Sequence, residues 1–143
     1  MAKKIYLIGS LRNPEIPRIG NYLRETGFDV FDDWFAGGKI ADDEWQAYEQ
    51  LRGRPYDAAL QGYAAQHVFH FDLEHIERSD IGVLVLPAGK SGHLELGYML
   101  GQGKDGYVLF DKEPERWDVM YNFAHGVFFD MKDLGRRLSE LHG

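Results

Sequence analysis

The segment that decides the fold is Ile81–Leu86 (Ile-Gly-Val-Leu-Val-Leu), followed by the glycine-containing turn Pro87–Gly92. Nearly every position of the segment is apolar, which is typical of a central strand in a parallel sheet that helices cover on both faces. After the turn, the spacing of apolar residues predicts a helix from about His93 to Gly101. The segment therefore predicts a strand–turn–helix unit at the centre of an α/β domain.

Shorter apolar runs on either side of this unit extend the alternation of strand and helix. Pro14 and Pro17 introduce a helical pattern that ends near Gly27, where a C-terminal cap belongs. A further helix begins at Asp42 or Asp43 and runs to about Leu51. The remaining predictions are strands at Lys4–Ile8, Phe28–Phe31, Tyr107–Phe110 and Val127–Phe129, and helices at Tyr56–Ser79, Trp117–Phe123 and Met131–Leu141.

This alternation predicts a flavodoxin-like, doubly wound α/β fold. We expect a single domain over residues 1–143, with a five-stranded parallel sheet in the order 2-1-3-4-5 and helices on both faces. Ligands of such folds bind beyond the carboxyl ends of the strands, near the point where the strand order reverses. The loop Gly9–Asn13 and the turn Pro87–Gly92 should therefore lie side by side and hold the ligand.

Composition excludes several classes of function. The chain has 143 residues, 44% of them hydrophobic, and a formal net charge of −7. An acidic chain without a basic run is a poor ligand for a nucleic-acid polymer, so we expect none as a partner. It has no cysteine, which excludes disulfides, thiolate catalysis and cysteine-bound zinc. The apolar run Ile5–Ile8 is too short for a signal peptide or a membrane span, so a cytoplasmic protein without a membrane partner is expected.

Several catalytic motifs are incomplete. Gly89-Lys90-Ser91 lacks the upstream glycine of a nucleotide-binding P-loop, because Leu84 stands in its place. His93 occupies the position of the second glycine in a serine-hydrolase elbow. No dinucleotide fingerprint is present, and His67, His70 and His75 do not follow a metal-binding pattern, so we interpret them as surface or half-buried residues. No metal and no cofactor are expected.

Two carboxylates stand out as candidates for chemistry. Glu95 follows the glycine-containing turn and opens a helix between apolar neighbours, and Asp72 lies within the segment His70-Phe71-Asp72-Leu73. Two carboxylates with separate duties, one attacking and one handling protons, are the usual arrangement for cleaving a glycosidic bond. A helix-start acid that merely interacts with the helix dipole is the alternative for Glu95.

Three segments in this order resemble the nucleoside 2-deoxyribosyltransferase superfamily, which includes the 2'-deoxynucleoside 5'-phosphate N-hydrolases. The segments are Ile5-Tyr6-Leu7-Ile8-Gly9-Ser10-Leu11-Arg12, Asp72-Leu73-x-x-Ile76-x-x-x-Asp80, and Gly92-His93-Leu94-Glu95-Leu96-Gly97-Tyr98 with Gly103-Lys104. The resemblance covers roughly residues 4 to 110.

The resemblance implies roles for particular residues. Glu95 would attack the anomeric carbon and form a covalent glycosyl-enzyme, Asp72 would assist at the base or place the nucleophile, and Tyr6 would hydrogen-bond Glu95. The loop Gly9-Ser10-Leu11-Arg12 would wrap the sugar phosphate, with Ser91 and Gly92 beside it. Lys90, Ser91 and Gly92 replace an acidic residue of the transferases, which favours an anion at the 5' end. Asn122 would reach a neighbouring subunit's pocket, so a homodimer or higher homo-oligomer is expected.

These observations predict an enzyme that cleaves the N-glycosidic bond of a 2'-deoxynucleoside 5'-monophosphate or a deoxynucleoside. Trp34, Phe35 and Tyr56 are candidates for stacking on the base, with core packing as the alternative for each. Three other functions remain open at this point. They are base exchange on free deoxynucleosides, cleavage of another N-glycoside such as a nicotinamide nucleotide, and non-catalytic nucleotide sensing on the same fold.

Overall fold

The five strands form one parallel sheet in the order β2-β1-β3-β4-β5, as predicted. The computed structural model describes residues 2–143. Four of the five strands differ from the predicted limits by one or two residues at an end. The strands are β1 (Lys4–Ile8), β2 (Asp29–Phe31), β3 (Ile81–Val85), β4 (Asp105–Leu109) and β5 (Gly126–Phe128).

Strand β3 is the centre of the sheet, because it pairs with β1 on one side and β4 on the other. Ile81 lies opposite both Ile5 and Asp105 in the register. All residues of β3 are buried, as expected for a strand that helices cover on both faces. The apolar run that predicted the fold is therefore its core strand.

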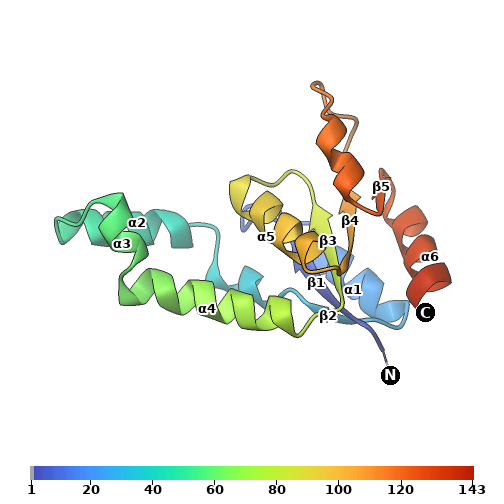
Figure 1. The fold of residues 1–143 in the computed structure, drawn as a ribbon, viewed down its shortest axis with the longest axis horizontal. Coiled ribbons are helices and arrows are strands. Elements are labelled where there is room, and N and C mark those ends of the chain that lie inside the picture. The colour runs from blue at the N-terminus through green and yellow to red at the C-terminus, as the bar shows by residue number, and fades with distance from the viewer. Residues whose placement is uncertain (1) are drawn as a thin grey trace.

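Helices cover the two faces of the sheet (Figure 1). On one face, α1 (Ile16–Glu25) and α6 (Met131–His142) enclose a core with alternate strand residues such as Leu7 and Val83. On the other face, α5 (Lys90–Gly101) and the end of α4 (Tyr63–Glu77) enclose a second core that includes Tyr6 and Leu84. Within the described chain, no helix has the length and apolar composition needed to cross a bilayer.

Two helix predictions are wrong. The pattern Tyr56–Ser79 is two helices, α3 (Tyr56–Leu60) and α4, because Gly62 adopts an extended conformation between them. The apolar spacing continues across this break and conceals it in the sequence. The segment Trp117–Phe123 forms only a short 3-10 helix, η2 (Val119–Phe123).

Helices α2 (Ala41–Leu51), α3 and the first turns of α4 form an arm that projects beyond the sheet (Figure 1). A short 3-10 helix, η1 (Asp33–Gly37), leads from β2 toward it. Helix α2 begins at Ala41, so the predicted capping residues Asp42 and Asp43 lie inside its first turn. There their negative charge interacts favourably with the helix dipole.

Helix α5 lies very close to the sheet because glycines stand where the two meet, Gly92 on the helix and Gly82 and Gly106 on the strands. A Cβ atom on Gly92 would come within 2.9 Å of Leu84, and one on Gly106 within 2.8 Å of Leu96. Both neighbours are buried core residues with no room to move away. The backbone of α5, which carries Glu95, is thus held at a fixed distance from the strands.

Candidate active site

The three predicted catalytic side chains meet on the sheet face that α4 and α5 cover. Tyr6 comes from β1, Asp72 from α4 and Glu95 from α5. The Tyr6 hydroxyl donates a hydrogen bond of 3.1 Å to Glu95 Oε2. Asp72 lies close enough that its charge raises the pKa of both Glu95 and Tyr6. Residues that are far apart in the sequence therefore form one constellation.

Burial and mutual repulsion shape the electrostatics of this constellation. Burial, together with the charge of Asp72, raises the pKa of Glu95 to about 7, while the hydrogen bond from Tyr6 opposes that rise. Burial raises the pKa of Asp72 to about 6. Within residues 2–143, no ion pair is formed by either carboxylate. The pair therefore holds a proton close to neutral pH, which is the property that an acid–nucleophile pair needs.

An aromatic wall lines the same face and was not predicted. Phe31 stacks on Tyr6 with ring centroids 5.5 Å apart, and His75 stacks on Phe31 at 3.8 Å with nearly parallel planes. Phe71 packs edge-on against His75 at 4.8 Å. The sequence contains a signal for part of this wall. His75 follows Asp72 by three residues and Phe71 by four, which places it near both on a helix.

The three histidines of this region have different surroundings. His67 and His70 are exposed, and His75 is half-buried, in agreement with the prediction. The Nδ1 atom of His75 is buried and has no hydrogen-bond partner in the structure. His75 is thus a member of the site that the sequence did not single out.

The loops Gly9–Asn13 and Pro87–Gly92 lie side by side, as predicted, and enclose a hollow of about 350 Å³. Arg12 is the only charged side chain among the residues lining it. The hydroxyl of Ser10 accepts a hydrogen bond of 3.1 Å from the Arg12 backbone amide. Helix α5 starts directly after Gly89, so its N-terminal amides lie at the edge of the hollow. A hydroxyl, a guanidinium and a helix N-terminus are ligands suited to a small anion. The lining residues are Ser10, Arg12, Asn13, Pro14, Pro87, Ala88 and Gly89.

Other predicted binding residues have different surroundings. Ser91 and Gly92 follow the hollow without lining it, and Gly92 instead permits the close packing of α5. Gly9 packs against Ile16 at the end of β1, and Leu11 is half-buried in the same loop.

Of the predicted aromatic residues, two are less exposed than their sequence context indicated. Trp34 and Phe35 are half-buried against the core, and the Trp34 indole donates a hydrogen bond of 2.7 Å to the Leu7 carbonyl. Tyr56 is 72% exposed and begins α3, away from the sheet (Figure 1). Asn122 is exposed in η2, where its amide donates to the Val119 carbonyl.

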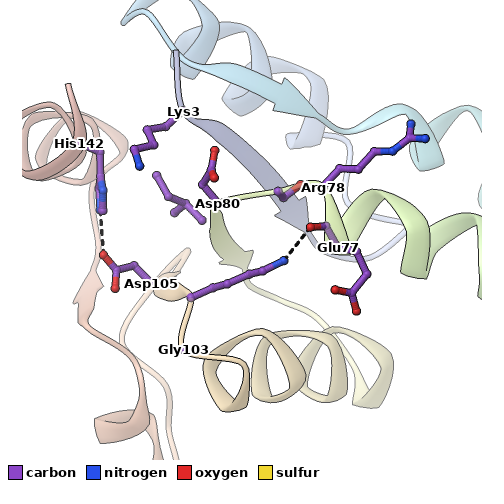
Figure 2. A pocket seen from close by; sticks show the side chains of 10 residues that line it. Lys3, Glu77, Arg78, Asp80, Gly103, Asp105 and His142 are labelled. Carbon is purple, nitrogen blue, oxygen red and sulfur yellow. Dashed lines mark hydrogen bonds and ion pairs between the residues drawn. The ribbon is translucent and has the colours of Figure 1, made fainter. Parts of the chain in front are cut away.

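A second hollow, of about 360 Å³, lies at the amino ends of the strands, opposite the site (Figure 2). Its acidic residues have basic or amide partners: Asp105 lies beside His142, and Asp80 accepts a hydrogen bond from the Lys4 backbone amide. Lys104 donates to the last carbonyls of α4. These partners fix strand and helix ends, which is a structural role. Residues 2–143 contain no group of three or more histidine and acidic side chains that could hold a metal ion.

Comparison with known proteins finds similarity only at the level of structure. No protein-family model and no curated protein matches the chain. A 2-deoxyribosyltransferase from Bacillus psychrosaccharolyticus has a similar structure, with a TM-score of 0.64 and 23% identity, over 92% of this chain and 90% of that one. The CMP N-glycosidase BcmB from Clostridium botulinum is similar with a TM-score of 0.59 and 15% identity, over 95% of this chain and 98% of that one. The chain therefore has the fold of these two enzymes, which confirms the fold that the sequence resemblance implied.

Proposed function

We propose that this protein cleaves the N-glycosidic bond of a deoxynucleoside or its 5'-monophosphate through a covalent intermediate on Glu95. The observation that carries the proposal is the half-buried Glu95 carboxylate, which Tyr6 hydrogen-bonds and whose pKa is raised by burial and by the charge of Asp72. The two structural neighbours described above are a 2-deoxyribosyltransferase and a CMP N-glycosidase, and both names refer to bonds at the anomeric carbon. These names support the proposal that the bond cleaved is a glycosidic bond.

In the proposed reaction, a Glu95 carboxylate oxygen attacks C1' and forms an ester. The C1'–N bond breaks, and its electron pair leaves with the base, which takes a proton from Asp72. A water molecule then attacks C1', gives a proton to Asp72, and releases the sugar and the Glu95 carboxylate. Splitting the substitution in this way replaces one difficult step by two easier ones.

The environments of the two acids support these roles. Near neutral pH the raised pKa values of Glu95 and Asp72 keep one proton on the pair, and transfer of that proton from Glu95 to Asp72 gives both the attacking carboxylate and the acid that protonates the base. The Tyr6 hydrogen bond stabilises the anionic form of Glu95, which is the form that attacks. A non-catalytic sensing module has no need for two half-buried carboxylates without cationic partners, so the enzyme is the better interpretation.

The hollow beside the site favours the 5'-monophosphate over the free nucleoside. Ser10, Arg12 and the N-terminus of α5 surround a space suited to a phosphate group, and Ser91 and Lys90 begin that helix. A free 5'-hydroxyl would leave these donors without their best acceptor, at a cost of about 1–3 kcal/mol for each charged hydrogen bond. The preference should therefore exceed about tenfold in kcat/KM.

The test is base release from a panel of deoxynucleosides and their 5'-monophosphates, measured by chromatography. Arg12→Ala should lower kcat/KM for the monophosphates by about tenfold or more. Arg18→Ala is the matched control, because Arg18 is an equally exposed arginine that pairs with Glu15 on α1. Equal turnover of a nucleoside and its monophosphate by the wild type would instead favour base exchange on free nucleosides. No base release from any compound would exclude the proposed function.

We also propose that the active unit is a homodimer, with the segment around Tyr121 and Asn122 near a neighbour's pocket. Large exposed side chains in this part of the chain support self-association: Trp117, Val119, Met120, Phe123 and Phe129. Light scattering combined with activity measurements over a dilution series should show a dimer. A fully active monomer would contradict this proposal.

A further inference from the structure

An ion pair joins the anion hollow to the arm. The guanidinium Nη2 of Arg12 donates a hydrogen bond of 3.0 Å to Asp43 Oδ2. Arg12 lies in the loop after β1, and Asp43 lies in the first turn of α2, 31 residues further along the chain. This contact ties the only charged side chain of the hollow to a carboxylate that does not line the hollow.

The contact places two anions in competition for one guanidinium. Arg12 has five N–H donors, and Asp43 engages one nitrogen only. A substrate phosphate carries close to two negative charges and three acceptor oxygens, so it is the stronger ligand. It would bind Arg12 next to a carboxylate that repels it, in a helix turn that also contains Asp42 and Glu44.

We propose that Asp43 is a specificity-determining residue: it holds Arg12 while the site is empty and competes with a 5'-phosphate for the guanidinium. Asp43 therefore weakens phosphate binding and sets how strongly monophosphates are preferred over nucleosides. This inference rests on the proposed function, because it assigns the phosphate to the hollow at Ser10 and Arg12.

The ion pair between Arg12 and Asp43 is weak, so a phosphate can compete with it reversibly. The side chains of Arg12 and Asp43 are 58% and 66% exposed, so water screens their attraction. Exposed pairs of this kind shift equilibria by at most about fivefold. The effect of Asp43 should consequently appear in the KM for a monophosphate, while kcat stays constant.

The experiment compares Asp43→Asn with Asp42→Asn, which removes the same charge from the same helix turn but has no contact with Arg12. Binding of 2-deoxyribose 5-phosphate is measured by calorimetry, and KM and kcat are measured with a monophosphate. We expect Asp43→Asn to tighten sugar-phosphate binding by about two- to fivefold. Asp42→Asn should change binding by much less. In an Arg12→Ala background, Asp43→Asn should have a much smaller effect, because the guanidinium for which the two anions compete is gone.

Three results would overturn the inference. The first is that Asp43→Asn binds the sugar phosphate more weakly than the wild type. The second is that Asp42→Asn tightens binding as much as Asp43→Asn. The third is that Asp43→Asn tightens binding by the same factor in the Arg12→Ala background. Absence of sugar-phosphate binding to the wild type would also overturn it, and base release from nucleosides would then still test the proposed function. Conversely, binding with the expected pattern but without base release from any compound would retain the role of Asp43 and exclude the catalytic proposal.

Discussion

The arm and the catalytic face each hold a glutamate that is largely shielded from water, Glu49 buried and Glu95 half-buried, and the pKa values of the two side chains shift in opposite directions. Glu49 of α2 is only 2% exposed and accepts two hydrogen bonds, of 3.0 and 2.9 Å, from Arg54. Those hydrogen bonds lower the pKa of Glu49 despite its burial. Among residues 2–143, Glu95 of α5 has only the neutral Tyr6 hydroxyl as a hydrogen-bond partner, and burial together with the charge of Asp72 raises its pKa to about 7.

The difference lies in whether the fold supplies a cation. A buried carboxylate with a bidentate arginine is held in its charged form and is structural, and removing one partner is strongly destabilising. A buried carboxylate without a cation can change its protonation near neutral pH, which suits it to chemistry. Burial acts to raise the pKa of both glutamates, and the partner decides the direction of the net shift.

The sharpest test of this comparison is to remove the charge of each glutamate in turn. Glu95→Gln keeps the shape but cannot form an ester at C1', so base release should fall by about 10³-fold or more. Glu49→Gln should leave kcat within a few-fold of the wild type, because Glu49 lies in the arm. Both rates are measured with the best substrate of the panel.

A covalent adduct provides an independent readout. A 2'-fluoro-2'-deoxynucleotide should leave a sugar on Glu95 that mass spectrometry of a proteolytic digest can locate. If Glu95→Gln releases base at nearly the wild-type rate, Glu95 is not the nucleophile and the comparison fails.

Asp72 provides the second test, because it shares the unpaired environment of Glu95. Asp72→Asn cannot donate a proton to the departing base, so turnover should fall by about 10²–10⁴-fold. Glu74→Gln is the matched control on the same helix, since Glu74 is exposed and pairs with Arg78. Substrates whose bases leave without protonation should lose less activity in Asp72→Asn. Equal losses for all bases would assign Asp72 to positioning instead of proton transfer.

Removing the charge of each glutamate should change the free energy of unfolding at pH 8 in opposite directions. The pKa of Glu95 rises from 4.5 to about 7 in the folded protein, which corresponds to a loss of about 3 kcal/mol of stability once Glu95 is ionised. This loss is absent at pH 4, grows as the pH rises through the interval between the two values, and is complete by pH 8. Glu95→Gln should therefore raise the free energy of unfolding at pH 8 by up to about 3 kcal/mol and leave it unchanged at pH 4.

Glu49→Gln should lower the free energy of unfolding at pH 8. The lowered pKa of Glu49 contributes stability above its ordinary value of 4.5, and this contribution is lost as the pH falls through the lowered value. The variant should be less stable than the wild type at pH 8, with a smaller difference in acid. Urea unfolding at several pH values measures both effects. If Glu95→Gln is also less stable than the wild type at pH 8, the ionised Glu95 carboxylate does not destabilise the folded protein.

The sequence was sufficient to predict the sheet and its order, because the alternation of strands and helices follows from local apolar patterns. Strand β4 was predicted to begin two residues late, since Asp105 and Gly106 do not look like strand residues. The break between α3 and α4 was missed because apolar spacing continues across Gly62. Local pattern thus predicted the elements well and their ends less well.

The site was predictable where its residues lie in short motifs. Tyr6, Asp72 and Glu95 each stand in a recognisable segment, and the structure brings them together. The stacking of His75 on Phe31 and the pairing of Arg12 with Asp43 depend on where α4 and the arm lie relative to the sheet. No local pattern encodes such contacts between distant segments, so the stacking of His75 on the sheet and the ion pair of Arg12 could be found only in the structure.

The close seating of α5 on the sheet has a consequence for anyone who would change the base preference of this protein by directed evolution. Gly92 and Gly106 leave no space for a side chain, so any substitution there would push α5, and Glu95 with it, away from the strands. A mutant library that includes these positions would consist largely of inactive members. Val68, by contrast, is 59% exposed on the helix that carries Asp72, so a side chain of another size there has space around it. Substitutions at exposed positions of α4, with α5 and its glycines left intact, should keep the position of Glu95 constant while the surface beside Asp72 varies.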